Sequence, residues 1–326
     1  MCIALLSTAH PKYKLILLDN RDEYINRPTA DATWWPSYPD VLGGRDLLRE
    51  VQGTWLGVTK SGKIAVLTNF REDRPPAPSA VSRGEIIKKF LTEDVGSTEQ
   101  FVTEVVNQGV ARDAGGFSLV CGHIGKGDQL AVISNRAQSG AEVPWICGHV
   151  VQTVGLSNTS FGDRTWPKVL DGEELMLKAI RENISDDKGE EELIESFLAL
   201  LSDDALTRKG LDPKEGLQTH ILELRNTIRV PPLGRQDMPD LPPDEIAAAK
   251  NDEVTRVLGN RQKGAASKQL GIDGIYATQK QTVILVDQDD RVRFVERTLF
   301  DNDCKPVTGK EGTIDTTFQI EVPPTK

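Results

Sequence analysis

A chain of 326 residues with 38% hydrophobic and 27% charged residues is long enough to bury one large core, so we expect a single globular domain over 1–326. The formal net charge of −10 argues against nucleic acid or an anionic membrane surface as the main partner. Four widely spread cysteines are typical of a reducing compartment, and no apolar run is long enough to span a membrane. The start of the chain lacks the pattern of a signal peptide, so we expect a cytoplasmic protein with no transmembrane segment. The oligomeric state does not follow from the sequence.

The first two dozen residues hold the densest chemical pattern in the chain. The segments 2–7 and 14–20 are largely apolar and a short turn separates them, so they predict a β-hairpin. Such a hairpin returns the polar residues 20–23 to the neighbourhood of Cys2. Because both segments are apolar at consecutive positions, we expect strands that are covered on both faces. Antiparallel strands covered on both faces are what a sandwich of several layers requires.

Cys2 is a candidate nucleophile. Removal of Met1 is expected before so small a residue, and it would leave Cys2 with a thiol and a free α-amine. An α-amine has a pKa of about 7.7–8.0 and suits the task of a general base for the thiol. Side chains alternate along a strand, so we expect only one of two pairs to face Cys2 unless the strand bends: Asn20 with Asp22, or Arg21 with Glu23. An ordinary cysteine beside a polar strand end explains the spacing alone equally well.

Residues 27–53 are rich in Pro and Gly and predict a long irregular loop, which is usually functional inside a compact domain. In this loop Trp34 and Trp35 are candidates for the mouth of a ligand pocket, or they cap the edge of the core. A hairpin is predicted next, over 54–59 and 63–69.

Helices over 83–92 and 97–108 are predicted by capping-box patterns that begin at Ser82 and Ser97. Arg83 falls in the first turn of the first helix, where a cation opposes the helix dipole. Its position indicates either that Arg83 binds a carboxylate or phosphate group, or that its side chain is solvated.

The rest of the chain mixes strand and helix patterns. Strands are expected over 117–124, 129–135, 151–157, 283–286 and 292–295, with an edge strand over 317–322. Helices are expected over 166–182, 190–201 and 203–208, and residues 218–230 fit either type. We interpret the proline-rich and partly helical stretch 231–273 as an insertion without its own core.

The start Met1-Cys2-Ile3 together with Asn20-Arg21-Asp22-Glu23 resembles the NRDE family, also called the transport and Golgi organisation protein 2 family. Further segments resemble the family in the expected order and span nearly the whole chain: Gly53–Gly57, Leu67–Phe70, Ser82–Glu85, Gly155–Asn158 and Thr282–Asp287. The resemblance implies an N-terminal nucleophile hydrolase-like fold, which is an α+β fold of four layers, αββα, with two mainly antiparallel sheets between layers of helices. It also implies a link to Golgi organisation and protein secretion, to lipid or acyl-CoA metabolism, or to haem transport.

The order of motifs also resembles the acylase branch of N-terminal nucleophile enzymes. It implies that Cys2 is the nucleophile, that Asp22 orients its α-amine and that Arg21 stabilises the thiolate. Asn69 and Asn158 would form the oxyanion hole, unless both are simply caps at strand ends. The remaining candidates, as ligand-binding residues, are Asn20, Glu23, Trp34, Trp35 and Arg83.

The chain departs from the family just before the strand that begins at Thr282-Val283, where the family commonly has Tyr-Gly-Thr-Arg. Here the sequence is Tyr276-Ala277-Thr278-Gln279-Lys280. Gln279 cannot supply the charge of that arginine, and Lys280 is shifted by one position, hence to the opposite strand face. Arg225 and Arg229 are alternative sources of this positive charge if the fold brings one of them to the same place.

Two Cys-Gly-His triplets, at 121–123 and 147–149, offer four soft ligands in principle, but their spacing matches no standard zinc framework. Buried cysteines beside surface histidines explain them more simply, so we expect no metal site. An axial haem ligand from either triplet is a further alternative.

Two functions remain open. In the one that we favour from the sequence, the protein holds a small amphipathic ligand such as haem, an acyl-CoA or another lipid, and requires no cofactor. It would then serve haem or lipid homeostasis in the cytoplasm, or in association with the Golgi or mitochondria. In the other, Cys2 cleaves an amide or thioester substrate.

Overall fold

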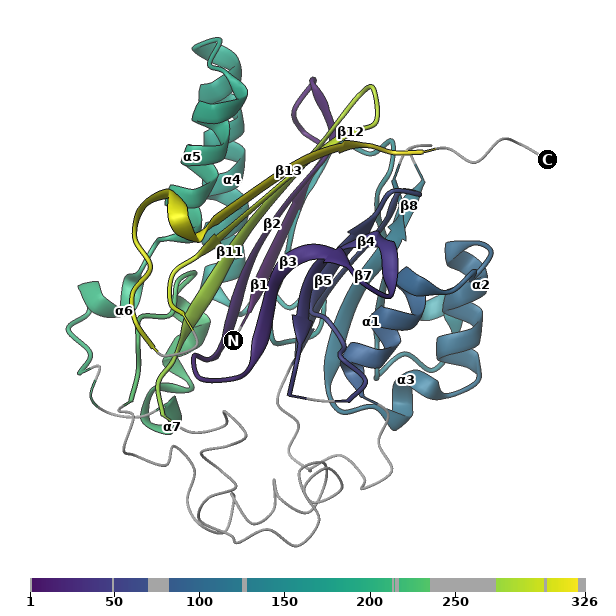
Figure 1. Ribbon diagram of the computed structural model, residues 1–326, viewed down its shortest axis with the longest axis horizontal. Helices are drawn as coiled ribbons and strands as arrows, with labels where there is room; N and C mark the ends of the chain where they lie inside the picture. The colour runs from purple at the N-terminus through teal and green to yellow at the C-terminus, as the bar shows by residue number, and fades with distance from the viewer. Residues whose placement is uncertain are drawn as a thin grey trace, which may run out of the picture.

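The computed structural model describes residues 2–48, 50–69, 82–124, 128–212, 214, 217–234, 274–301 and 304–321. In this part of the chain two antiparallel sheets lie face to face and helices cover their outer faces (Figure 1). This arrangement confirms the predicted four-layer α+β fold. The helix expected within the insertion, and the insertion beyond residue 234, lie outside the described residues.

The first sheet contains the amino-terminal hairpin. Its six described strands, in order across the sheet, are β10 (Thr153–Leu156), β1 (Ile3–Ser7), β2 (Tyr13–Tyr24), β11 (Tyr276–Asp287), β12 (Arg291–Thr298) and β13 (Thr313–Gln319). The hairpin β1–β2 has the predicted antiparallel pairing, with Ile3 opposite Asn20. Because β2 continues past the start of β1, residues 20–23 lie beside Cys2. The expected edge strand is β13.

The second sheet corrects one expectation. Its described strands are, in order, β3 (Thr29–Trp35), β4 (Tyr38–Asp46), β5 (Leu56–Thr59), β6 (Lys63–Asn69), β7 (Phe117–His123), β8 (Gln129–Ser134) and β9 (Trp145–Cys147). The prediction of an irregular loop over 27–53 is wrong, because most of it forms β3 and β4. Glycine served as a loop signal there, yet Gly43 is a packing residue: a Cβ on it would lie 2.5 Å from the carbonyl oxygen of Leu56 in β5.

Helices flank the sheets on both outer sides, as Figure 1 shows. The second sheet is covered by α1 (Arg83–Thr92), α2 (Thr98–Val102) with the π-helical turn η1 (Thr103–Asn107), and α3 (Val110–Asp113). The first is covered by α4 (Pro167–Ser185) and α5 (Glu190–Leu201). Shorter pieces are α6 (Ala205–Arg208), α7 (Leu217–His220), η2 (Gly140–Glu142), η3 (Glu223–Asn226) and η5 (Gly309–Gly312). Ser97 forms its predicted capping box with Gln100, whereas the Ser82 side chain does not cap α1.

Alternate residues of β1 face two separate cores. Ala4 and Leu6 pack between the two sheets, while Ile3 and Leu5 pack under α4 and α5. Burial of each large apolar side chain contributes about 1.5–3 kcal/mol, so both faces of the hairpin stabilise the fold. The consecutive apolar residues in the sequence therefore did indicate a strand covered on both sides.

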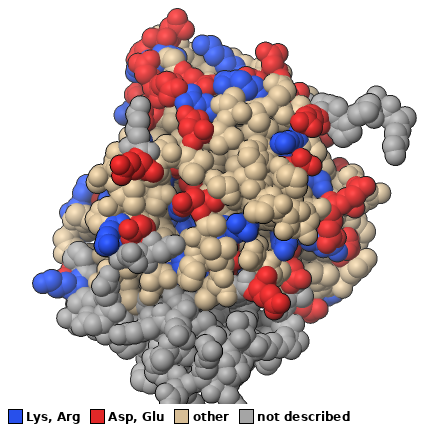
Figure 2. Space-filling model, in the orientation of Figure 1, with Lys and Arg blue, Asp and Glu red and all other residues tan. Residues whose placement is uncertain are grey.

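No helix in the described ranges is both long enough and apolar enough to cross a membrane. Figure 2 shows acidic and basic side chains intermingled at the end of the molecule where α5 begins. There Glu190 pairs with Arg291 and Arg293, and Arg293 also pairs with Asp315. These ion pairs fasten the start of α5 to β12 and β13.

Candidate functional site

Cys2 lies directly before β1 and is only 4% exposed. The backbone N–H of Asp22 donates to its Sγ at 3.4 Å, and the thiol donates to the carbonyl of Asp22 at 3.8 Å. The hairpin thus brings the sulfur against β2. Burial raises the pKa of the Cys2 thiol to about 12, since the low-dielectric interior disfavours the thiolate. The thiol as it stands is therefore protonated at neutral pH.

Asp22 is buried and held by neighbouring strands. Its Oδ1 accepts a hydrogen bond from the Thr278 hydroxyl at 2.6 Å, and its main-chain carbonyl accepts one from the Tyr276 hydroxyl at 3.2 Å. Asn20, on the same side of β2, donates from Nδ2 to the carbonyls of Leu201 and Ile228. Asn20 thus uses its amide hydrogens to fasten β2 to the helical layer.

Arg21 points to the other side of β2, between the sheets. It donates to the hydroxyl of Thr29 at 3.2 Å and to the side-chain oxygen of Gln279. Its guanidinium carbon lies 5.0 Å from the ring centroid of Trp55, within range of a cation–π interaction. These contacts position Arg21 as a buried tie between β2, β3, β11 and Trp55.

The prediction that Lys280 and Gln279 face opposite sides of their strand is wrong. β11 bulges between Thr278 and Lys280, so Lys280 stays opposite Arg21 while Gln279 also turns toward Arg21. Lys280 pairs with Glu296 at 3.5 Å and with Asp31, and it donates to Thr298. The two alternative arginines are engaged elsewhere: Arg225 donates to the Thr165 carbonyl and Arg229 lies 3.7 Å from Asp204.

The ends of β6 and β10, which belong to different sheets, meet beside Cys2. The Ser157 hydroxyl donates to the Cys2 carbonyl at 2.7 Å, and the Thr68 hydroxyl donates to the Ser157 carbonyl at 2.8 Å. Asn158 donates from Nδ2 to the main-chain carbonyl of Asn69. The two asparagines proposed for the oxyanion hole are therefore brought together next to Ser157, which bonds to the main chain of Cys2.

Three of the predicted site residues line one small polar opening of about 90 Å³: Glu23, Asn69 and Arg83. Arg27 and Trp55 line it as well. Arg27 pairs with Asp46 at 2.7 Å and lies 3.8 Å from Glu23, and Arg83 donates to the Gly116 carbonyl at 3.2 Å. The guanidinium of Arg27 lies 5.8 Å from the Trp55 ring centroid, so this ring links the opening to Arg21.

Trp34 and Trp35 lie elsewhere. Trp34 packs between the sheets against Phe318, with ring centroids 5.1 Å apart. Trp35 is buried on the side of the second sheet that the helices cover, and its Nε1 donates to the Gly43 carbonyl at 2.9 Å. Both belong to strand β3 and not to a loop. Their packing agrees with the alternative that they cap the core and not with a place at the mouth of a pocket. They are core residues.

Sequence reasoning missed two buried ionisable residues near the thiol. Lys168 is fully buried near the start of α4, and Asp19 is buried on the side of β2 that faces the other sheet. Burial lowers the pKa of Lys168, and the nearby Asp22 and Cys2 oppose that shift. Burial raises the pKa of Asp19 well above its usual range, and Asp22 adds to the effect. Asp19 directly precedes the 20–23 motif and alternates with Arg21, a signal that was available in the sequence.

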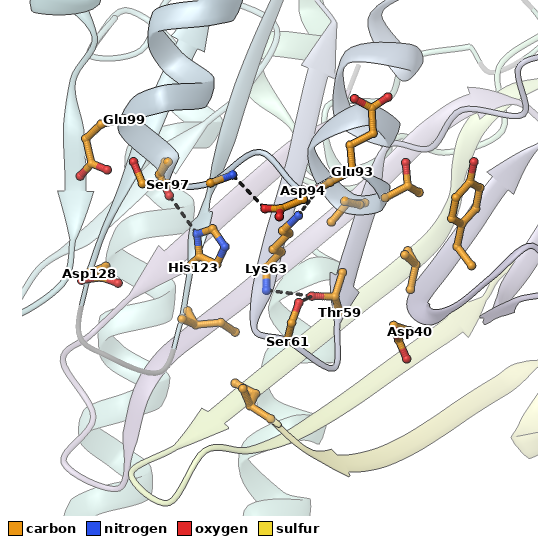
Figure 3. A pocket seen from close by; sticks show the side chains of 18 of the residues that line it. Asp40, Thr59, Ser61, Lys63, Glu93, Asp94, Ser97, Glu99, His123 and Asp128 are labelled. Carbon is orange, nitrogen blue, oxygen red and sulfur yellow. Dashed lines mark hydrogen bonds between the residues drawn. The ribbon is translucent and has the colours of Figure 1, made fainter. Parts of the chain in front are cut away.

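A larger cavity of about 880 Å³ lies at the opposite end of the second sheet from Cys2, where β5 and β7 end and β6 begins (Figure 3). Its acidic residues are Asp40, Glu93, Asp94, Glu99 and Asp128, and Lys63 and His123 also line it. Lys63 donates to the carbonyls of Phe90 and Glu93 at the end of α1, and His123 bonds to the Thr98 hydroxyl. None of the predicted site residues lines this cavity. Its cation and imidazole are thus used to hold the helix ends, and we place the candidate chemistry at Cys2 instead.

The two Cys-Gly-His triplets do not converge. Cys121 packs in the core beneath the helices of the second sheet, and Cys147 packs between the sheets. Over the described ranges no group of three or more His, Cys, Asp or Glu side chains is placed to hold a metal ion.

The chain resembles known proteins along most of its length. The family described as Transport and Golgi organisation 2 matches residues 1–301. The mouse Transport and Golgi organization 2 homolog is 29% identical over 294 residues, covering 89% of this chain and 88% of the mouse protein. The bovine homolog is 31% identical over 298 residues, with coverage of 89% and 88%.

Solved structures show more distant likenesses. A Caenorhabditis elegans ortholog of N-acylethanolamine-hydrolyzing acid amidase is 15% identical with a TM-score of 0.42, covering 64% of this chain and 89% of that one. A mutant conjugated bile acid hydrolase from Clostridium perfringens is 9% identical with a TM-score of 0.35, covering 99% and 98%.

Proposed function

The chain belongs to the Transport and Golgi organisation 2 family, and for this member we propose that Cys2 is a nucleophile that cleaves an amide or thioester bond. One observation carries the proposal: the buried thiol lies against Asp22 at the point where the ends of β6 and β10 meet. A sulfur nucleophile, a carboxylate and two amide side chains at one end of two sheets are the groups that acyl transfer needs.

The reaction would begin with removal of Met1. The α-amine of Cys2 then accepts the proton of the thiol, and the sulfur attacks the acyl carbonyl carbon. As the bond to the leaving amine or thiol breaks, that group takes up the proton, and an acyl-thioester on Cys2 remains. Water, deprotonated by the same amine, hydrolyses this thioester and returns the thiol. Asp22 orients the amine, because its carboxylate is fixed by Thr278.

Asn158 and Asn69 would stabilise the negative oxygen that forms in each step. The Nδ2 of Asn158 carries two hydrogens, and only one is needed for the bond to the Asn69 carbonyl. The second is available for an oxyanion. One such donor lowers the barrier by about 2.7–4 kcal/mol.

The test is turnover of acyl substrates by the full-length protein. Acyl-CoA thioesters and N-acyl amides are offered to the wild-type protein and to the variants Cys2→Ala and Cys304→Ala. We expect hydrolysis of one of the two classes, its loss in Cys2→Ala and its retention in Cys304→Ala. Hydrolysis that survives Cys2→Ala would overturn the proposal.

A second candidate function, that of a ligand carrier, is favoured by the protonated state of the Cys2 thiol. Cys2 is buried and its pKa is raised to about 12, and a protonated buried thiol is inert. In this alternative the protein carries haem, an acyl-CoA or another lipid in the cytoplasm and serves Golgi organisation and protein secretion through that ligand. Equilibrium binding separates the two, because a carrier binds stoichiometrically with and without Cys2 and releases the ligand unchanged.

A further inference from the structure

Lys168 is a buried cation that the acyl-transfer steps above do not use. It is 0% exposed and follows Pro167, the first residue of α4. Gly172 lies one turn further along the same helix face, and a Cβ on it would come within 3.0 Å of the Leu5 side chain and 3.5 Å of Ile3. This face of α4 therefore lies directly on β1, the strand that Cys2 precedes.

The position of Lys168 is unfavourable for the helix. The first turn carries the positive end of the helix dipole, where a cation is repelled, and α4 has no acidic residue there. Removal of an ammonium from water is also costly unless an anion is near. The charges that favour the ammonium form are those of Asp22 first and of Cys2 second. Ile16 and Leu18 pack against α4, and Asp22 alternates in step with them along β2, so its side chain lies on the side of the sheet that α4 covers. Lys168 is buried on that same side.

Besides burial, which raises the pKa of the Cys2 thiol, the positive amino terminus lowers it, and the other charged and titratable groups near the thiol come from β2 and β11. Asp22 and Asp19 on β2 oppose ionisation of the thiol. Arg21 acts on Asp19 from between the sheets, and the Tyr276 hydroxyl of β11 interacts with both Asp22 and Cys2. The two β2 carboxylates thus oppose the thiolate, and α4 contributes a buried cation in addition to the amino terminus.

We propose that Lys168 is a positioning residue for Cys2: its ammonium holds the Asp22 carboxylate in place and makes the Cys2 thiolate easier to form. Lys168 keeps its protons throughout, and the thiol proton goes to the α-amine of Cys2, so no additional covalent step arises. The inference rests on the proposed role of Cys2. It names a residue that supplies positive charge near the thiol in a chain where Gln279 stands at the position of the arginine that the family commonly has.

The rate of Cys2 alkylation as a function of pH tests this role. Full-length wild type, Lys168→Met, Lys168→Gln and Lys168→Arg are treated with iodoacetamide, and the Cys2 peptide is quantified by mass. The control is Lys178→Met on the same helix, because Lys178 lies at the surface 3.8 Å from Glu182. An opposite charge close to a titrating group moves the pKa of that group by about 1–3 pH units.

We expect both neutral variants to slow Cys2 alkylation about tenfold or more at every pH at which the wild-type Lys168 is protonated, because they lack the positive charge that favours the thiolate. Lys168→Arg should keep a profile close to wild type, and Lys178→Met should not differ from it. A wild-type profile in a folded neutral variant overturns the inference. Failure of both neutral variants to fold also overturns it, since the lysine would then be a structural requirement of α4.

The result is separable from the acyl-cleavage test. Thiol alkylation reports the ionisation of Cys2 whether or not an acyl substrate is ever turned over. If no acyl substrate is cleaved but the alkylation profile of Cys2 changes in the Lys168 variants, the role of Lys168 stands. If acyl substrates are cleaved and that profile does not change, only the role of Lys168 is rejected.

Discussion

The side chain of Asn158 donates a hydrogen bond to the main-chain carbonyl of Asn69, and this bond joins the two sheets at the end where Cys2 lies. Asn69 ends β6, and Asn158 follows Ser157, whose hydroxyl donates to the Cys2 carbonyl. One amide therefore ties the sheets together and lies next to the candidate nucleophile. Its structural and chemical contributions must be measured separately.

Asn158→Ala should reduce the rate of Cys2 acylation by about 10²–10³-fold if the amide stabilises the oxyanion. The lost hydrogen bond alone costs only about 0.5–1.5 kcal/mol of stability. Thr68→Val is the matched control, because it removes the bond to the Ser157 carbonyl in the same corner but no oxyanion donor. Stopped-flow acylation and thermal unfolding of both variants give the comparison. Equal acylation rates in Asn158→Ala and Thr68→Val would show that Asn158 only joins the two sheets and does not stabilise the oxyanion.

The four cysteines should differ widely in their reaction with alkylating agents. Cys2 has a pKa raised to about 12 by burial, and burial also raises the pKa of Cys121 and Cys147. Cys304 is partly exposed. In protein that retains Met1, alkylation at neutral pH should therefore occur first at Cys304, and the rate at Cys2 should rise about tenfold per pH unit up to its pKa. Peptide mapping checks this order, and Cys2 labelling at pH 7 as fast as Cys304 contradicts it.

Asp19→Asn should stabilise the protein at neutral pH. Burial raises the pKa of Asp19 in the folded state, so between about pH 3.9 and that raised value the folded state binds more protons than the unfolded state. Stability is then present at low pH and lost as the pH rises. A pKa that is one pH unit higher in the folded state costs about 1.4 kcal/mol of stability once the group is ionised, and the uncharged asparagine avoids this cost.

Urea unfolding at pH 4, 6 and 8 measures this effect. The gain from Asp19→Asn should be largest at pH 8 and close to zero at pH 4. Asp171→Asn on the exposed side of α4 is the control and should show no such trend. A gain that is constant across pH would contradict burial of an ionisable Asp19.

Gly53→Ala should destabilise the fold by about 1–3 kcal/mol. A Cβ on Gly53 would lie 2.7 Å from the carbonyl carbon of Gly84, so the chain before β5 and the start of α1 would have to move apart. Gly140→Ala is the control, since the nearest atom to its Cβ would be a Val102 methyl at 3.5 Å. Thermal unfolding of the two variants distinguishes this contact from a general effect of adding a methyl group.

The sequence indicated the parts of the fold that local patterns determine. Consecutive apolar residues in β1 and β2 identified a hairpin covered on both faces, and the Ser97 capping box marked the start of α2 correctly. The strands β3 and β4 were missed because the prolines and glycines of 27–53 together indicated a loop, whereas Gly43 is required by the close approach of β5. Long-range packing, which no local pattern reports, decided that segment.

The candidate site divides in the same way. The return of residues 20–23 to the neighbourhood of Cys2 followed from strand pairing and could be predicted, whereas which of them contacts the thiol could not. The bulge at Gln279 could not, because one unpaired residue changes which side chains face Arg21. Lys168 could not be predicted either: a lysine in an amphipathic helix is ordinarily solvated, and only the packing of α4 on β1 turns it inward.

The most direct test of the central claim is the intact mass of the native protein before and after treatment with an activated acyl ester. The account predicts a chain that lacks Met1 and gains one acyl group, which is absent in Cys2→Ala and retained in Cys304→Ala. A chain that keeps Met1 and gains no acyl group at Cys2 would contradict it.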